Sequence, residues 1–374
     1  MDIQLKRVNS WEDLKKFIYL PAKIHAGHSN WVPPIYRDEW KYFNPQKNKA
    51  FSYSDTLRVL AYKQNKLRGR IMGIINNRYN SLKNEKTARF GYLETFKDEE
   101  VVRALLNHVE EWAKDKGMTK IIGPYGFTDQ DPEGFLTEGF ENRATVATYY
   151  NYEWMPRFVE KQGYTKDADY YVYKLRVPEV IPEFYQRIYQ RVQRKGQFEV
   201  LEFSKKRDLK PWIVPVLSLM NECYTRSNIY GYTPLDKKEM HDLAKKYLPI
   251  LDPPFIKLVN KGNEPVAFII GIPDMTQGIQ KAKGHLFPLG FLHILKAAKR
   301  TKQLDLLLGA IKEEYRGKGL DVLMGVKMLA SAQKAGMEVI DTHHEMESNT
   351  KVRAEMEKMG GQVYKRFRVY QKQL

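Results

Sequence analysis

The stretch "GAIKEEYRGKGLDVLMG", residues 309–325, decides the fold that the sequence predicts. An apolar strand pattern runs into a loop with two glycines, an Arg and a Lys, Arg316–Asp321, and then into a helix pattern. Glycines at such a turn let successive backbone N–H groups point at one spot, and the helix N-terminus adds the positive end of its dipole. The loop is therefore expected to bind a pyrophosphate, and a plain turn capped by Asp321 is the alternative.

The same unit occurs earlier in the chain. "AQKAGMEVID", which ends the helix after the loop, matches "AKDKGMTKII" with Gly336 set against Gly117. Further on, "MEKMGG" matches "VEKQGY" with Gly360 set against Gly163. Two matches in the same order, each at a helix end before an apolar run, indicate a duplication. The first copy carries an insertion within residues 123–144.

Both copies show the same order of expected elements, and a segment with two prolines, "LRVPEVIPEF" from Leu175, is the expected joint between them. We therefore predict an α+β protein of two tandem units, 1–177 and 178–374, each a mostly antiparallel mixed sheet flanked by helices. In the first unit the expected elements span residues 3–8, 10–26, 56–76, 88–96, 98–117, 120–126, 152–163 and 168–177. In the second they span 198–204, 211–227, 253–273, 304–314, the helix after 321, 338–345, 348–360 and 362–371.

The order of elements in the second copy resembles that of the GNAT acyltransferase superfamily. This order is a strand, the glycine loop, a helix, a strand, an Asn-led helix ending in "MEKMGG" and a last strand. The ending "EKMGG…YKRFRVY" is similar to that of bacterial tandem-GNAT proteins of unassigned substrate. The C-terminal resemblance covers roughly residues 304–372, whereas for residues 1–177 it rests on element order and the repeat.

The resemblance implies an acyl-CoA (acetyl-CoA) co-substrate and assigns its contacts. The strand before the loop would line the pantetheine arm, the loop would hold the pyrophosphate, and an asparagine at the start of the next helix would touch the pantetheine. The residues implied are Ala310, Ile311 and Lys312 for the arm; Arg316, Gly317, Lys318, Gly319, Leu320 and Asp321 for the pyrophosphate; and Asn349.

Two positions depart from the GNAT pattern. Asp321 stands where the loop ends in Gly or Ala, so a carboxylate lies near the phosphates or caps the helix. Many GNAT enzymes place a Tyr seven residues after the Asn as the acid for the leaving thiolate, and here that residue is Met356. The nearest phenol in sequence is Tyr364, so Tyr364 is the candidate acid, although a thiolate can leave without one.

Acylation needs a neutral amine, so a carboxylate or a water relay must take its proton. Our candidate base is Glu347, two residues before Asn349; pairing with an Arg or capping a helix is its structural alternative. Strand alternation over 338–345 places Asp341, His343 and Glu345 on one face. His343 and the adjacent His344 would then point oppositely and no third ligand is spaced for them, so no metal is expected.

In the first copy, Lys97–Glu100 stand where the loop should be, with no glycine and three adjacent acids. Acids repel a pyrophosphate, so this copy is expected to lack a working cofactor loop. Its insertion carries five acids and only one base, which would suit a cationic amine; a solvated loop is the interpretation we favour. The acids are Asp129, Asp131, Glu133, Glu138 and Glu141.

Residues 281–303 carry six Lys/Arg, no acid and an apolar centre. They would cover an acyl chain, touch a membrane surface or dock an acidic carrier protein, but a helical hairpin packed on its own unit is the simplest interpretation. The tail "YKRFRVYQKQL" interleaves cations and aromatic residues, and strand alternation explains that better than nucleic-acid binding.

Composition restricts the class of protein. The net charge of +17 suggests an anionic partner, such as a phosphorylated cofactor or an acidic carrier protein, or serves solubility alone. The longest apolar runs are too short to cross a membrane, and the single cysteine, Cys223, excludes an intrachain disulfide. We expect a cytoplasmic protein with no specific nucleic-acid partner.

These observations together predict an N-acyltransferase that moves an acyl group from acyl-CoA to an amine that the sequence does not identify. The second unit would bind the acyl-CoA, and the amine would lie between the units. Two alternatives stay open. One is an N-acyltransferase that uses an acyl-carrier protein as donor, and the other is an aminoacyl-transferase-like or non-catalytic acyl-CoA/amine-binding module.

Overall fold

The computed structural model describes residues 3–227 and 229–374. In the N-terminal half, the duplicated order expected from the sequence is present, with the insertion adding one short strand. The elements of this half are β1 Ile3–Arg7, α1 Trp11–Ile24, α2 Tyr36–Tyr42, η1 Lys49–Tyr53, β2 Ser54–Lys63, β3 Lys66–Asn76, α3 Asn77–Lys83, β4 Thr87–Thr95, α4 Glu99–Asp115, β5 Lys120–Gly123, β6 Phe135–Glu138, α5 Trp154–Glu160 and β7 Thr165–Arg176.

The C-terminal half repeats seven strands in the same order, with additional helices. Its elements are α6 Glu183–Arg194, β8 Glu199–Glu202, α7 Lys206–Leu209, η2 Lys210–Trp212, α8 Ile213–Arg226, α9 Lys237–Tyr247, η3 Pro253–Phe255, β9 Ile256–Lys261, β10 Glu264–Pro273, α10 Thr276–Lys281, α11 Gly290–Arg300, β11 Gln303–Ile311, η4 Glu313–Tyr315, α12 Leu320–Lys334, β12 Val339–Asp341, β13 Glu345–Met346, α13 Thr350–Lys358 and β14 Gln362–Gln373.

The landmarks of the predicted duplication have the same local geometry in both halves. Helix α4 ends before Gly117 (φ +75°) and α12 ends before Gly336 (φ +66°). Gly163 and Gly360, which follow α5 and α13, have φ values of +84° and +81°. These left-handed conformations favour glycine, which explains why the four positions match in the sequence.

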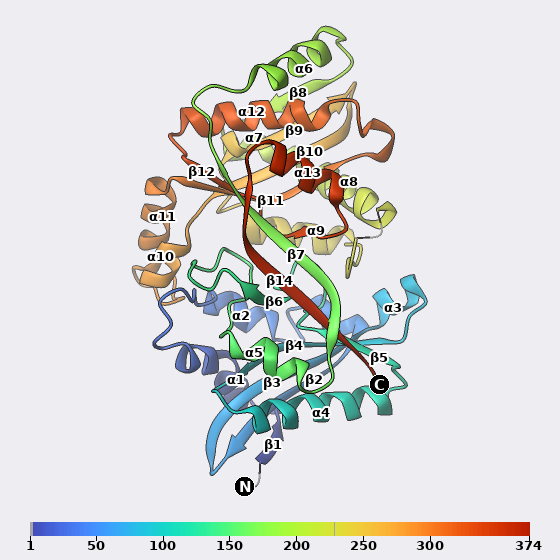
Figure 1. Cartoon of the computed structure of the whole chain (residues 1–374), viewed down its shortest axis with the longest axis vertical. Coiled ribbons are helices and arrows are strands. Elements are labelled where there is room, and N and C mark those ends of the chain that lie inside the picture. The colour runs from blue at the N-terminus through green and yellow to red at the C-terminus, as the bar shows by residue number, and fades with distance from the viewer. Residues whose placement is uncertain (1–2, 228) are drawn as a thin grey trace.

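All strands belong to one sheet, and the halves exchange their last strands. The order is β1-β2-β3-β4-β5-β14-β7-β12-β11-β10-β9-β8, with β6 beside β14 and β13 beside β7. The long strands β7 and β14 pair antiparallel across the middle of the molecule (Figure 1). The end of β14 pairs with β5, and the end of β7 pairs with β12. Each half's last strand therefore lies beside the fifth strand of the other half.

One predicted strand is interrupted. The sequence indicates a continuous strand over 338–345, but the structure has β12 and β13 with a break between them. His343 has a φ of +59°, and its N–H donates to the Asp341 carboxylate (2.8 Å), while the Thr342 hydroxyl accepts from Tyr173 N–H (3.0 Å). The expectation that Asp341, His343 and Glu345 share one face of a regular strand is therefore wrong.

The predicted basic hairpin also packs differently from the expectation. The turn after α10 docks on the N-terminal half, where Tyr36 N–H donates to Gly284 O (3.0 Å) and Gln280 Nε2 donates to Trp31 O (2.7 Å). The His285 ring lies over Tyr36, with ring centroids 4.9 Å apart. The hairpin thus bridges the halves and does not cover its own half alone. Among the described residues, no helix is long and apolar enough to cross a membrane.

Candidate active site

The glycine loop connects β11 to α12 through the short helix η4, as predicted. Gly317 and Gly319 both have positive φ, +72° and +85°. A Cβ on Gly319 would stand 2.7 Å from Val192 Cγ2 of α6, so the close approach of α6 also requires glycine there. Arg316 and Lys318 are exposed at the loop. The turn thus has the backbone form and the charge that a pyrophosphate site needs.

Side chains around the loop have defined contacts. The Arg316 guanidinium donates to Ser227 Oγ (2.6 Å) and to Ile311 O (3.2 Å), and the Lys318 ammonium lies 5.0 Å from the centroid of the Tyr315 ring. Gly319 is the N-cap residue of α12 and Leu320 is buried beneath the loop. Asp321 lies in the first turn of α12. Burial, and then the charges of Glu355 and Asp321, raise the pKa of Tyr185 in α6.

The strands β11 and β12 part beside the loop. They pair in parallel only where Gln303–Asp305 of β11 lie beside Val339–Asp341 of β12. On the other side of β11, the pairing with β10 continues to Ile311. Beyond Asp305, no described strand pairs with β11 on the β12 side, and Gly309 is exposed there. A gap thus opens between β11 on one side and residues 342–346 on the other.

The phase of the β10–β11 ladder decides which amides face this gap. Lys312 N–H donates to Val266 O (2.9 Å), so in the alternating antiparallel pattern Lys312 and Ala310 direct their backbone groups to β10. Gly309 and Ile311 direct theirs to the gap. Of the three residues implied for the pantetheine arm, only Ile311 therefore presents its amide to the gap, and Gly309, which the sequence analysis did not single out, joins it. The Lys312 ammonium pairs with Glu222 (3.2 Å) and with Glu264.

The equivalent gap of the N-terminal half is filled by its own chain. Strands β4 and β5 also part, after Arg89, but Tyr125 N–H donates to Phe90 O (2.8 Å) and Tyr92 N–H donates to the Tyr149 hydroxyl (2.8 Å). A Cβ on Gly91 would lie 2.5 Å from Tyr125 O, so the filling segment is in close contact.

The turn before α4 differs from the glycine loop as well. Asp98 caps α4, accepting from Val101 N–H, and Lys63 pairs with both Asp98 (2.9 Å) and Glu100 (2.7 Å). This turn presents carboxylates where the C-terminal half presents cations, which supports the expectation that only the second copy binds a phosphorylated cofactor.

The two predicted catalytic residues are both engaged by other side chains. The Glu347 carboxylate pairs with Lys166 (2.6 Å). The Tyr364 hydroxyl donates to buried Asp341, at the fork where β11 and β12 part, and burial together with that carboxylate raises the pKa of Tyr364 well above its usual range. Such a phenol is a weak proton donor at neutral pH. Asn349 is exposed at the start of α13, with its amide 3.4 Å from Glu345.

The structure points to three other side chains: Tyr224, which the sequence analysis did not name, and Glu345 and Asp129, which it named without the role of base. The Tyr224 hydroxyl of α8 donates to Gly309 O (3.3 Å). Burial raises the pKa of Glu345, on the opposite wall, to about 7, and burial raises the pKa of Asp129, from the acidic insertion, to about 7 as well. Burial, and after it the charges of Asp129 and Glu345, raise the pKa of the Tyr224 hydroxyl. A carboxyl that titrates near neutral pH is suited to accept a proton from an amine.

The acidic insertion is a solvated loop only in part: Glu138 and Glu141 are exposed, whereas Glu133 is buried and Asp129 and Asp131 are half-buried. Glu133 is 7% exposed and lies 3.8 Å from His344 of the other half. Burial raises the pKa of Glu133 to about 8 and lowers that of His344 to about 3, so both are mainly neutral at pH 7. Tyr42 donates to Asp131 at 2.7 Å. Within the described residues, no cluster of three or more His, Cys, Asp or Glu side chains has the arrangement of a metal site.

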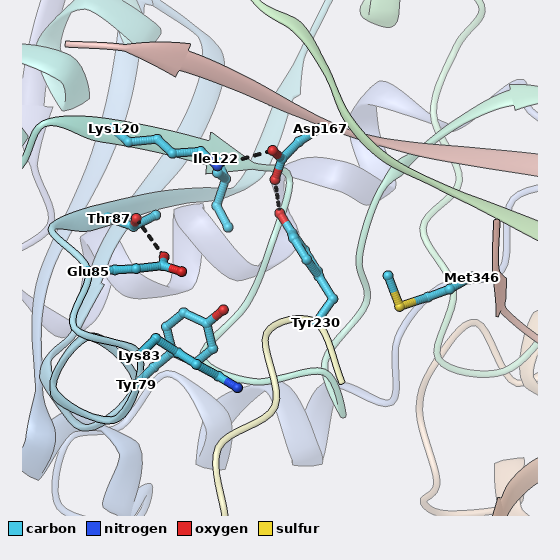
Figure 2. Close-up of a pocket in the computed structure, with 9 residues that line it drawn as sticks. All are labelled: Tyr79, Lys83, Glu85, Thr87, Lys120, Ile122, Asp167, Tyr230 and Met346. Atoms are coloured by element: carbon cyan, nitrogen blue, oxygen red, sulfur yellow. Dashed lines mark hydrogen bonds and ion pairs between the residues drawn. The ribbon is translucent and has the colours of Figure 1, made fainter. Parts of the chain in front are cut away.

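A separate hollow lies between the halves, and Figure 2 shows its lining. Its volume is about 200 Å³; none of its lining residues belongs to the loop, and only Met346 also belongs to a wall of the gap. Asp167 pairs there with Lys120 (3.1 Å) and accepts from the Tyr230 hydroxyl. Met346 lines it next to Glu345 in sequence, and adjacent strand residues point to opposite faces, so the hollow and Glu345 lie on different sides of β13. The gap beside Gly309 is therefore the candidate site.

Comparisons with known proteins agree with the fold. The chain superposes on a tandem GNAT protein from the clavulanic acid biosynthesis pathway with a TM-score of 0.55 and 11% identity, covering 100% of this chain and 98% of that one. The chain therefore has the tandem GNAT fold, an α+β fold over its full length. No protein-family model matches it.

Two curated proteins are similar in sequence over nearly their whole length. One is the bacterial ceramide synthase of Caulobacter vibrioides (strain NA1000 / CB15N), 25% identical, with 100% of this chain and 98% of that protein aligned. The other is protein YghO of Escherichia coli (strain K12), 22% identical, with 97% and 93% aligned.

Proposed function

We propose that the chain is an N-acyltransferase that moves an acyl group from acyl-CoA to the amino group of a long-chain lipid amine. The observation that carries this proposal is the gap beside Gly309, which ends at the cationic glycine loop. A thioester lying in the gap would have its pyrophosphate at the loop. In this proposal residues 178–374 hold the acyl-CoA site and residues 1–177 hold none.

The donor would be held mainly by backbone groups. The amides of Gly309 and Ile311 would bond the pantetheine arm, and the Arg316–Asp321 loop with the dipole of α12 would hold the pyrophosphate. Helix α6 packs against this loop, and a row of cations follows its exposed face to the residue after its end: Arg187, Arg191, Arg194 and Lys195. Asn349 remains a proposed contact of the pantetheine.

The reaction would be direct attack of the amine on the thioester. The ammonium form of the acceptor first gives one proton to solvent; then the C–N bond forms as the C–S bond breaks, the second proton of the attacking nitrogen passes to the Glu345 carboxylate, and CoA leaves as a thiolate. A backbone N–H of β11 would stabilise the carbonyl oxygen as negative charge develops on it. Tyr224 would donate a hydrogen bond to the leaving sulfur, and Tyr364 would position Asp341 at the fork.

Two observations support a lipid amine as acceptor. The chain is similar over its full length to a protein named bacterial ceramide synthase, and ceramide is the amide of a long-chain amino alcohol. The charges of Asp129 of the first half and of Glu345 both act on the Tyr224 hydroxyl, so two carboxyls would attract a cationic amine toward it. We also propose a cytoplasmic location, because acyl-CoA and a reduced Cys223 both belong to that compartment.

A direct assay tests the proposal. The purified chain is expected to convert sphinganine and palmitoyl-CoA into the amide, measured by mass spectrometry, with one free thiol released per amide formed. Polar amines such as glucosamine serve as the comparison acceptors. Thiol release without amide, or activity only with a carrier-protein thioester, would contradict an acyl-CoA N-acyltransferase.

The variant with Ser at Lys296, Lys299, Arg300 and Lys302 should keep full activity toward short acyl-CoA.

Cys223 is expected to take no part in the transfer. It is buried in α8, and burial raises the pKa of its thiol to about 11, so it is protonated at neutral pH. Cys223→Ser should therefore keep kcat within about twofold of the parent, since only a thiolate is a good nucleophile. A variant that folded normally but formed no amide would instead indicate an acyl-enzyme intermediate on this residue.

A further inference from the structure

The outer side of α11 and the turn before it expose an unusual amount of apolar surface. Of nine large apolar side chains that are exposed among the described residues, five lie between positions 287 and 295. Phe287 is 70% exposed and Leu289 is 61% exposed, at the tip of the hairpin. On α11, three more share the outer face by helical spacing: Phe291, Leu292 and Leu295, with exposures of 39%, 48% and 52%.

Cations flank this apolar face. Lys299 follows Leu295 by one helical turn, and Lys296 and Arg300 lie along one side of it. Residues 281–303 contain no acid, and no carboxylate of the described residues pairs with Lys281, Lys283, Lys296, Lys299 or Arg300. The apolar surface is therefore bordered by positive charge that no neighbouring side chain neutralises.

The hairpin is held firmly in this position. Its inner side is buried through Gly290 and Ile294, and the turn is fixed to the N-terminal half by the Tyr36–Gly284 hydrogen bond and the contact of His285 with Tyr36. A Cβ on Gly290 would lie 1.7 Å from His285 O, so the tip is tightly wound. Figure 1 shows α10 and α11 together at one side of the molecule, beside the junction of the halves. The exposed side chains thus project from a rigid base.

We propose that the α11 face, residues 287–300, docks on the surface of a bilayer that contains anionic phospholipids. Aromatic and leucine side chains beside unpaired Lys and Arg are the combination that binds an interfacial helix to such a surface. The apolar side chains protrude, which suits insertion among acyl chains better than contact with a polar acidic protein. A second copy of this chain would bring like charges together. With 11 residues, α11 lies in the plane of the bilayer.

This inference does not require the transfer reaction, because it concerns where the chain binds and not what it catalyses. It would place the gap near a membrane from which a lipid amine could be drawn. The test therefore measures binding to vesicles without any acyl donor, and its failure would leave the proposed function untouched.

The experiment is flotation of the full chain with vesicles of phosphatidylcholine alone or with phosphatidylglycerol. We expect binding to the anionic vesicles that weakens as salt rises. The variant F287D/L292D should bind at least about tenfold more weakly, because it removes two inserted side chains. The matched control is L82D/V180D, which adds the same charge at two apolar side chains that are 48% and 75% exposed elsewhere; it should bind like the parent.

A second measurement locates the contact. Cys223 is only 4% exposed, so a polarity-sensitive dye can be placed on Leu289→Cys, with Val180→Cys as the control position. The dye at 289 should shift to the blue on adding anionic vesicles, and the dye at 180 should not. No binding by the parent, equal binding by F287D/L292D, or a parent dimer that only this variant dissociates would overturn the proposal. Protection of the dye at 289 by an acyl-carrier protein and not by vesicles would also overturn it.

Discussion

Glu345→Gln is expected to lower kcat for amide formation by about a hundredfold or more, the range that a positioned general base contributes. The parent should show a limb in its kcat–pH profile with an apparent pKa near 7, because burial raises the pKa of Glu345 to about 7 and only the carboxylate accepts a proton. The Gln variant should lack that limb. Steady-state rates with saturating donor from pH 5.5 to 9 measure both effects.

The same substitution should make the protein more stable at alkaline pH. Folding raises the pKa of Glu345 from 4.5 to about 7. The contribution of this carboxyl to the free energy of unfolding is therefore complete below pH 4.5 and is lost as the pH rises from 4.5 through 7. Gln cannot ionise. Relative to the parent, Glu345→Gln should therefore gain about 1 to 3 kcal/mol between pH 4 and pH 8, measured by denaturant unfolding.

Glu347→Gln is the matched control, because Glu347 lies two residues away and is paired with Lys166. It should keep kcat within about threefold of the parent, the effect expected from losing a partly exposed ion pair. Loss of activity in this variant with normal activity in Glu345→Gln would return the role of base to Glu347, as the sequence first suggested.

Arg316→Glu is expected to raise the Kd for coenzyme A by about a hundredfold or more, since it exchanges a charge-assisted contact with phosphate for repulsion. Isothermal titration calorimetry should give one site per chain for the parent. Lys97→Glu, at the corresponding turn of the first half, should change neither the affinity nor the number of sites. Two equal sites in the parent would contradict the view that the first half binds no cofactor.

Gly319→Ala provides a test that leaves charge unchanged. The added Cβ would meet Val192 at 2.7 Å, and the residue has a φ of +85°, so the loop must shift. Coenzyme A binding should weaken while Gly317→Ala, where the Cβ meets open space, should lose less despite a similar φ of +72°.

The loop and the order of elements could be predicted because each leaves a local signal. Gly117 and Gly336 end helices in the left-handed conformation, and the apolar spacing of α4 and α12 fixes their buried sides. Gly317 and Gly319, in the loop before α12, also have positive φ. These features depend on residues that are close in sequence, and both the repeat and the expected elements follow from them.

The proposed catalytic constellation could not be predicted, because it depends on contacts between distant segments. Tyr224 is an ordinary helix residue until α8 brings it to Gly309, 85 residues later in the chain. Asp129 lies in a segment whose composition is that of a solvated loop. Its pKa is raised mainly by burial, which the sequence does not reveal. The break at His343 likewise arises from hydrogen bonds that no alternation pattern contains.

The exchange of β7 and β14 gives the first half a role in folding that does not depend on catalysis. Strand β5 pairs with β4 on one side and with β14 on the other, and β14 ends at residue 373. During translation of this sequence, the edge of β5 therefore lacks its native partner until β14 has been synthesised. Neither half can be deleted or expressed alone without leaving such an edge free to aggregate. A duplicated copy that had lost its cofactor loop would then still be retained by selection, as an obligatory folding partner for the copy that kept it.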